Sequence, residues 1–221
     1  MNREICFYFD HISNNAWIAW TQIQALAAKH ACSVTPVPVL FAGLLQASKQ
    51  MGPAETPSEM RWTLRNTLRK AALLGIPLNP PASHPFNPLL SLRVSSLEMD
   101  NAIRLRLVDA LFRAVWAEGQ DVTDPVVIRR IATNSGIADR DVLAEAADDA
   151  TKNRLREQTD TAIRRGVFGV PTMGAGDELF WGYDDFPYLE LYLAGRDPLP
   201  SEFPESWANV RASSVRRQAK T

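Results

Sequence analysis

The order in which strand and helix patterns follow one another constrains the fold of this chain more than any other feature of its sequence. A run of apolar, β-branched and aromatic residues at 5–9 stops at Asp10, which is typical of a strand buried on both faces. Residues 16–29 then carry apolar side chains three or four positions apart, which predicts a helix with one buried face. Residues 33–40 read as a second strand, and its prolines place it at a sheet edge. A strand, a helix and a strand so close together form a βαβ unit, so the two strands should be parallel.

The rest of the chain has a different character. Between about residues 58 and 166 the sequence shows helical periodicity and helix boundaries, with almost no strand pattern. Two short strand patterns follow at 170–173 and 178–181, separated by the turn residues 174–177, and a last helix pattern covers 184–194. Two halves of one sheet, interrupted by helices, predict an α/β chain with a thioredoxin-like fold and a large all-helical insertion between the βαβ and ββα halves.

This order also predicts the domain organisation. Residues 1–57 form the first half of the thioredoxin-like domain, and residues 58–165 form the helical insertion domain. Residues 166–200 complete the thioredoxin-like domain, and the polar residues 201–221 form a loosely held C-terminal tail.

Charge and hydropathy exclude several kinds of partner. The chain has 24 Lys and Arg against 25 Asp and Glu, whereas nucleic-acid-binding proteins usually carry a basic excess. Its opening residues lack the charged lead and apolar stretch of a signal peptide, and no apolar run is long enough to span a bilayer. We therefore expect a soluble cytoplasmic protein that binds neither nucleic acid nor a membrane.

The cysteines and histidines exclude two kinds of site. Cys6 and Cys32 lie 26 positions apart, so the chain has neither a CxxC redox pair nor a metal-ligand spacing of cysteines. The three histidines are scattered and form no ligand pattern either. We expect no metal site.

Ser13 is the first candidate for chemistry, because it precedes the first predicted helix. A helix N-terminus offers unpaired N–H groups and a partial positive charge, which favour an anion. Thioredoxin-like enzymes place their reactive cysteine here, but residues 13–16 contain none. A serine cannot exchange disulfides, although its hydroxyl can donate a hydrogen bond to a thiolate supplied by a ligand. The alternative is that Ser13 only caps the helix. His11 lies close enough to be considered as a base, but a loop histidine without a catalytic role is the favoured interpretation.

Two later segments could complete a ligand site. Val170-Pro171 leads into a strand where this fold places a cis proline, opposite the first helix. A cis bond would turn the backbone N–H and C=O of Val170 outward, toward an extended ligand; the alternative is an ordinary trans proline. Asp184, which ends the segment 181–184, could receive a ligand's ammonium group or could be a plain N-cap.

These signals occur in an order that resembles the 2-hydroxychromene-2-carboxylate isomerase family. That family is related to kappa-class glutathione transferases, within the DsbA-like branch of thioredoxin folds. The resemblance covers about residues 4–195. Its motifs are Phe-Tyr-Phe-Asp at 7–10 followed by Ser13, Trp-Ala-Glu-Gly at 116–119, Arg-Gly-Val-Phe-Gly-Val-Pro-Thr at 165–172, and Glu-Leu-Phe-Trp-Gly at 178–182 followed by Asp184.

The resemblance implies glutathione as the cofactor. Ser13 matches the family's catalytic serine, which holds the glutathione sulfur as a thiolate. Val170, before the cis Pro171, matches the residue that pairs with the cysteinyl backbone of glutathione. The segment that matches the site of the γ-glutamyl end consists of Trp181, Gly182, Tyr183 and Asp184. The family also suggests a homodimer and a small aromatic substrate.

The sequence departs from the family pattern around these motifs. The family usually reads Ser-Pro-x-Ser-Tyr after the first strand, where this chain has Ser-Asn-Asn-Ala-Trp at 13–17. In the family, a lysine and then a Gly-Asn pair normally follow the second strand, and the asparagine contacts the ligand. The matching positions here are Gln46, Lys49 and Gln50, so Gln50 takes the place of the asparagine. Asp185 replaces a common arginine. The thiol site is kept, while the surroundings of the second substrate have changed.

Two classes of function follow. The first is a glutathione-dependent isomerase in aromatic-compound degradation, which converts 2-hydroxychromene-2-carboxylate to trans-o-hydroxybenzylidenepyruvate with the glutathione thiolate as nucleophile. A kappa-type glutathione transferase that acts on other electrophiles is a close variant. The second class is a non-catalytic thioredoxin-fold module that binds glutathione or a peptide.

Overall fold

The βαβ unit forms as predicted. In this computed structural model, which describes residues 3–199, 205–211 and 213–214, β1 (Arg3–Phe9) and β2 (Cys32–Pro38) pair in parallel, from Arg3 opposite Cys32 to Phe9 opposite Pro38. The helix α1 (Asn14–Lys29) connects them.

The second part of the sheet is the predicted hairpin. β3 (Thr172–Ala175) and β4 (Glu178–Trp181) are antiparallel, and β3 also pairs antiparallel with β1. Within the described residues the strand order is β2-β1-β3-β4, so β2 lies at an edge, as its prolines indicate. β3 begins at Thr172 rather than at Val170, because residues 169–171 form a bend and the pairing with β1 ends at Thr172.

Between β2 and β3 the described chain is helical. Its elements are α2 (Phe41–Ser48), the 3₁₀ turn η1 (Pro53–Glu55), α3 (Pro57–Leu74), α4 (Leu89–Ser96), α5 (Asn101–Trp116), α6 (Pro125–Asn134), α7 (Val142–Ala147) and α8 (Asp149–Arg164). After β4 follow the 3₁₀ turn η2 (Tyr183–Asp185), α9 (Phe186–Leu193) and α10 (Glu205–Ala208). The sequence pattern did not predict α2. Of the predicted C-terminal tail, residues 201–204, 212 and 215–221 lie outside the described part of the chain.

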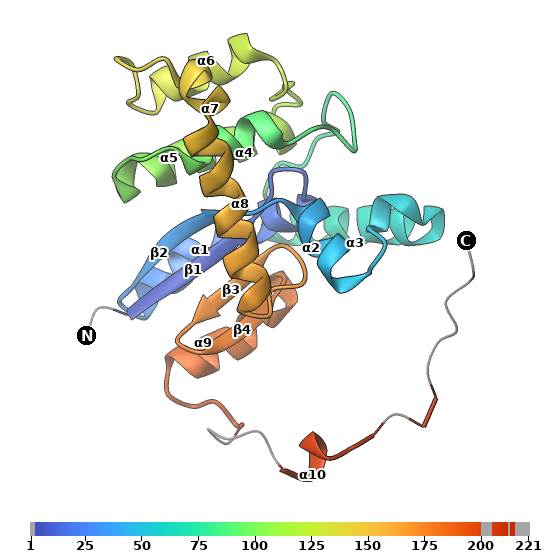
Figure 1. Cartoon of the computed structure of the whole chain (residues 1–221). Coiled ribbons are helices and arrows are strands. Elements are labelled where there is room, and N and C mark those ends of the chain that lie inside the picture. The colour runs from blue at the N-terminus through green and yellow to red at the C-terminus, as the bar shows by residue number, and fades with distance from the viewer. Residues whose placement is uncertain (1–2, 200–204, 212, 215–221) are drawn as a thin grey trace.

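Alternating side chains of β1 pack against different helices. Ile5, Phe7 and Phe9 belong to the main core together with α1 and α5, whereas Tyr8 on the opposite face packs with Val39 and with Ala162 of α8. Figure 1 shows α8 crossing in front of the sheet, from the helical segment to the β3–β4 hairpin. Both faces of β1 are therefore covered, which explains its unbroken apolar sequence. No helix in the described part of the chain is both long and apolar enough to cross a membrane.

Phe112 connects the helical segment to the sheet. It lies on α5 and is fully buried, with its ring centroid 5.5 Å from that of Phe9 and 5.9 Å from that of Trp20. His11 and Trp17 complete its aromatic surroundings, at 4.7 and 6.4 Å. One continuous core thus contains side chains from both parts of the chain.

We expect Phe112→Ala to lower the free energy of unfolding by about 3–5 kcal/mol, because it leaves a cavity inside this aromatic group. Urea unfolding followed by circular dichroism measures the change. Tyr188→Ala is a suitable control, since Tyr188 is 60% exposed and its loss should cost less than about 1 kcal/mol. Similar losses for the two variants would contradict the central role of Phe112.

Candidate functional site

Ser13 caps α1, which is one of the two roles that its place in the sequence suggested. Its backbone is extended, with φ −91° and ψ 114°, and its Oγ accepts the N–H of Ala16 at 3.1 Å. The first turn of α1 contains no acidic residue, so no carboxylate of the helix itself competes for its positive end. The cap alone does not exclude a second role, because the hydroxyl still has a proton to donate.

The strand pairing brings Val170 to Ser13. Tyr8 near the end of β1 pairs with Thr172 at the start of β3, so the loop after β1 and the loop before β3 meet at one edge of the sheet. The Val170-Pro171 bond is cis, as expected. The Ser13 hydroxyl donates to the carbonyl of Val170 at 3.4 Å, a long hydrogen bond that a closer acceptor could replace. Within the described part of the chain, no acceptor pairs with the Val170 N–H.

The segment after β4 lies against the same loop. Gly182 donates its N–H to the carbonyl of Pro171 at 2.9 Å, and the Asp185 carboxylate accepts the N–H of Trp181 at 2.7 Å. The Trp181 indole is about half exposed and packs on Phe168, 5.2 Å between ring centroids. Gly169 leaves room for this indole, because a Cβ at that position would lie 2.7 Å from its Nε1. Ser13, Val170, Pro171 and the start of segment 181–184 thus form one site.

Asp184 is not an N-cap, so that alternative was wrong. It lies inside η2, and its carboxylate accepts a hydrogen bond from Lys70 Nζ of α3 at 2.6 Å. The Lys70 side chain is largely buried, at 13% exposure, whereas that of Asp184 is 71% exposed. Lys70 therefore holds an acidic group that still faces solvent. Sequence analysis missed Lys70, because nothing local links residues so far apart.

Asp10 is a second residue that the sequence analysis did not assign to the site. Its side chain is fully buried and accepts two backbone N–H groups, that of Ile12 at Oδ1 (3.1 Å) and that of Phe41 at Oδ2 (3.0 Å). Loss of hydration raises the pKa of this carboxyl to about 7, although both hydrogen bonds lower it. The available signal was its position, a carboxylate directly at the end of a buried strand.

His11 lies in the loop between β1 and α1, as expected, but its side chain points into the core rather than to solvent. The ring is fully buried, and this burial lowers the pKa of its imidazole to about 3. Its Nε2 lies 3.1 Å from the hydroxyl of Ser95, which donates its own proton to the carbonyl of Ser91. We therefore assign the His11 proton to Nε2, which leaves Nδ1 without a hydrogen-bond partner among the described residues. The ring is a neutral part of the core.

Residues of the helical segment hold the loop that precedes Ser13. The Trp116 indole donates to the carbonyl of His11 at 2.9 Å, and His84 Nε2 lies 3.1 Å from the carbonyl of Ile12. The rings of His84 and Trp116 contact each other edge to face. The loop therefore carries hydrogen bonds on successive carbonyl groups.

Gln50 and its neighbours lie at the C-terminal end of α2. Gln50 is exposed just beyond α2, and its N–H donates to the carbonyl of Leu45 at 3.0 Å. Gln46 and Lys49 belong to the same exposed helix end. No hydrogen bond joins the Gln50 side chain to another described residue, so its predicted contact with a ligand stays a prediction.

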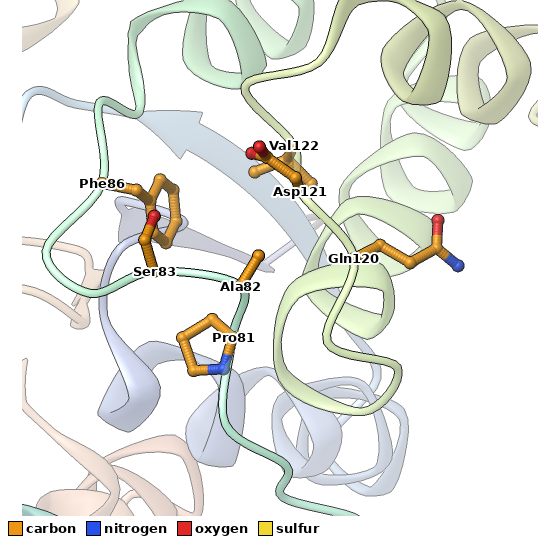
Figure 2. A pocket seen from close by; sticks show the side chains of 7 residues that line it. All are labelled: Pro81, Ala82, Ser83, Phe86, Gln120, Asp121 and Val122. Atoms are coloured by element: carbon orange, nitrogen blue, oxygen red, sulfur yellow. The ribbon is translucent and has the colours of Figure 1, made fainter.

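Two hollows lie in the helical segment of the chain. Figure 2 shows the residues that line the first hollow, which belong to the connector around residues 81–86 and to the loop 120–122. This hollow has a volume of about 10 Å³, which is room for one water molecule. A larger hollow of about 240 Å³ lies between α5 and α6 and is lined in part by Arg113 and Arg130. Neither is lined by a predicted site residue. Among the described residues no three His, Cys, Asp or Glu side chains are grouped to hold a metal ion, and Cys6 and Cys32 are both free thiols.

Comparison with known proteins places this site in a family context. Residues 4–194 match the model of the DSBA-like thioredoxin domain. A 2-hydroxychromene-2-carboxylate isomerase of Sphingobium xenophagum is 30% identical over 196 residues, which is 87% of this chain and 99% of that protein. Glutathione S-transferase kappa 2 of Caenorhabditis elegans is 26% identical, over 87% of this chain and 93% of its own.

A solved structure agrees with these relatives. The structure of a 2-hydroxychromene-2-carboxylate isomerase superposes with a TM-score of 0.81 at 27% identity, and the match covers 87% of this chain and 95% of the other. The predicted thioredoxin-like fold of the DsbA branch, with helices inserted between the two halves of the sheet, is thereby confirmed.

The buried carboxyl of Asp10 should make fold stability depend on pH. Its pKa is about 7 in the folded protein, whereas an unfolded chain gives aspartate a pKa of about 4. Between those values the folded protein binds a proton that the unfolded chain has lost, and this stabilisation disappears as the pH rises through 7. Between pH 4 and pH 8, the free energy of unfolding of Asp10→Asn should therefore rise by about 3–4 kcal/mol relative to that of wild type.

Urea unfolding of both proteins at intervals across this range tests the prediction. Only the difference between the two proteins is informative, because His11, with its lowered pKa, gives both of them an opposite dependence below pH 6.5. Thr159→Val is the control, since Thr159 Oγ1 accepts the neighbouring N–H of Leu40 without titrating. A constant difference between Asp10→Asn and wild type would disprove the raised pKa.

Proposed function

We propose that this chain, which belongs to the DSBA-like thioredoxin domain family and, within it, to the 2-hydroxychromene-2-carboxylate isomerases, is a glutathione-dependent isomerase whose Ser13 holds the glutathione sulfur. It is an enzyme of isomerase or transferase type, as its relatives are. The substrate we propose is 2-hydroxychromene-2-carboxylate, as in the relatives' name, with trans-o-hydroxybenzylidenepyruvate as the product.

The observation that carries this proposal is the position of the Ser13 hydroxyl. It lies at the positive end of α1, a helix of 16 residues, and among the described residues its proton has one acceptor, the Val170 carbonyl, at the long distance of 3.4 Å. A hydroxyl at a helix N-terminus can donate to a thiolate and stabilise its charge. The chain has no cysteine at this position, so the sulfur must come from a ligand.

The surrounding residues suit the rest of glutathione. The free N–H of Val170 is available to the backbone of the cysteinyl residue, in the manner of an added strand. The exposed carboxylate of Asp184, fixed by Lys70, can accept the γ-glutamyl ammonium group. Gly182 and Tyr183 join these two positions, and Trp181 borders them with an apolar face. We retain Gln50 as a proposed contact that only the family resemblance supports.

Bound in this site, glutathione would supply a nucleophile that adds to the substrate, permits bond rotation and leaves unchanged. The residues of the protein would bind and orient the tripeptide and keep its sulfur ionised near neutral pH. His11 is excluded as the proton acceptor because it is buried with a strongly lowered pKa. No described residue need change its covalent state.

A kappa-type glutathione transferase is the second candidate, because of the similarity to such an enzyme along most of the chain. Activity assays with 2-hydroxychromene-2-carboxylate and with simple electrophiles distinguish the two reactions. Binding of glutathione without turnover of either substrate would instead favour the non-catalytic module.

We further propose that the enzyme is a cytoplasmic homodimer that acts on a small aromatic compound during its degradation. The dimer rests on the family resemblance alone. Sedimentation velocity of the purified chain gives the mass that decides it.

Removing the Ser13 hydroxyl should leave glutathione bound but raise the pKa of its thiol. We expect wild type to show thiolate absorbance near pH 7, and Ser13→Ala to raise the thiol pKa by about 1–2 pH units, roughly 1.5–3 kcal/mol, because one charge-assisted hydrogen bond is lost. Ultraviolet titration of the complex measures both values. Ser13→Gly should behave alike but remain more stable than Ser13→Ala, because glycine replaces a cap residue at a cost of only a few tenths of a kcal/mol.

Asp184→Asn provides the matched control for this experiment. It should weaken glutathione binding about tenfold, through loss of the pair with the ammonium group, and leave the thiol pKa of the complex unchanged. Absence of any thiolate signal in wild type at saturating glutathione would refute the enzymatic proposal.

A further inference from the structure

We propose that Asp10 is the positioning residue of the Ser13 site, and that this site holds its binding geometry only while the Asp10 carboxyl is ionised. The inference rests on the proposed function, since it concerns how the same site takes up glutathione. It adds a residue that does not itself touch the ligand.

The geometry gives Asp10 control over two loops. Ile12, whose N–H donates to Oδ1, directly precedes Ser13, and Phe41, whose N–H donates to Oδ2, begins α2. The backbone carbonyl of Asp10 also accepts the N–H of Ser13 at 3.1 Å. One residue therefore connects the chain that leaves β1 with the chain that leaves β2, at the sheet edge where Ser13 and Val170 meet.

Both side-chain bonds depend on the charge of the carboxyl. A carboxylate has two acceptor oxygens, whereas a protonated carboxyl turns one of them into a donor. The two N–H groups approach different oxygens, so protonation of either oxygen weakens one of the two connections. A hydrogen bond to a charged acceptor is also about twice as strong as a neutral one.

The surroundings of Asp10 supply no cation that would keep it ionised. Within the described part of the chain it forms no ion pair, and its charge is compensated only by the two N–H groups. Among its neighbours, His11 has a lowered pKa and is neutral, and Tyr8 has a raised pKa. His84 lies against the carbonyl of Ile12, and Thr159 of α8 is uncharged. The carboxyl consequently titrates near pH 7, where its charge changes over a narrow range.

The test is the pH dependence of ligand affinity in the full chain. S-methylglutathione is the probe, because it has no thiol whose titration would obscure the result. If only the ionised form binds, calorimetry should show an affinity about eightfold weaker at pH 6 than at pH 7.5, since the ionised fraction of a group with a pKa of about 7 falls by that factor. Asp10→Asn should bind weakly at both pH values, with no such dependence.

Two controls separate Asp10 from its neighbours. His84→Gln removes the imidazole that lies 3.1 Å from the Ile12 carbonyl, and the eightfold change should persist. Thr159→Val removes a neutral hydrogen bond to Leu40, so it should loosen the segment between β2 and α2 without altering the pH profile. Tighter binding by Asp10→Asn than by wild type would show that its charge merely repels the ligand, and would overturn the proposal.

A measurement on wild type alone protects the test against a variant that does not fold. The backbone amide resonances of Ile12 and Phe41 should move together with pH, with one midpoint near 7, because both N–H groups report on one carboxyl. Tight binding of S-methylglutathione with a flat pH profile refutes the role of Asp10 and leaves the proposed function intact. Absence of binding at every pH refutes the proposed function, while the two amides still decide whether Asp10 couples the loops.

Discussion

The antiparallel pairing of β1 with β3 is the interaction on which the rest of this site depends. It places Tyr8 opposite Thr172, so that residues more than 160 positions apart in the sequence meet at one sheet edge. The parallel partner β2 ends at the same edge, and Asp10 joins the two loops that follow. The intervening helices tighten this arrangement, since Phe112 fills the core beneath it and Trp116 holds the loop above.

Local sequence was sufficient for most of the elements, although not for α2, and for the cap at Ser13. The βαβ unit, the hairpin and the cap at Ser13 follow from periodicity and capping chemistry, which act over a few residues. The pair of Lys70 with Asp184 was not predictable in this way, because it depends on how α3 packs against η2. The same holds for the burial of His11, which lies in a loop as its sequence suggested but whose ring is enclosed by residues distant in the sequence.

Asp10 and His11 show how burial acts on adjacent groups of opposite charge type. Loss of hydration raises the pKa of the acid and lowers that of the base, so both side chains favour their neutral forms inside the protein. Their contributions to stability oppose each other between about pH 4 and pH 6.5. For His11 this neutral state is compatible with a role in packing. For Asp10 it conflicts with accepting two N–H groups, because protonation turns one of the two carboxyl oxygens into a donor.

The burial of Ala16 limits how such a site could change in evolution. In a CxxC arrangement the second thiol would occupy this position, but Ala16 is fully buried and its N–H is bound to the Ser13 hydroxyl. Dithiol exchange at these positions would require two substitutions, since either one alone yields a single thiol in the motif. A cysteine at position 16 would also have to fit its sulfur into a closed part of the core, where an added atom usually destabilises the fold. The packing behind the helix end therefore opposes a second thiol independently of any ligand.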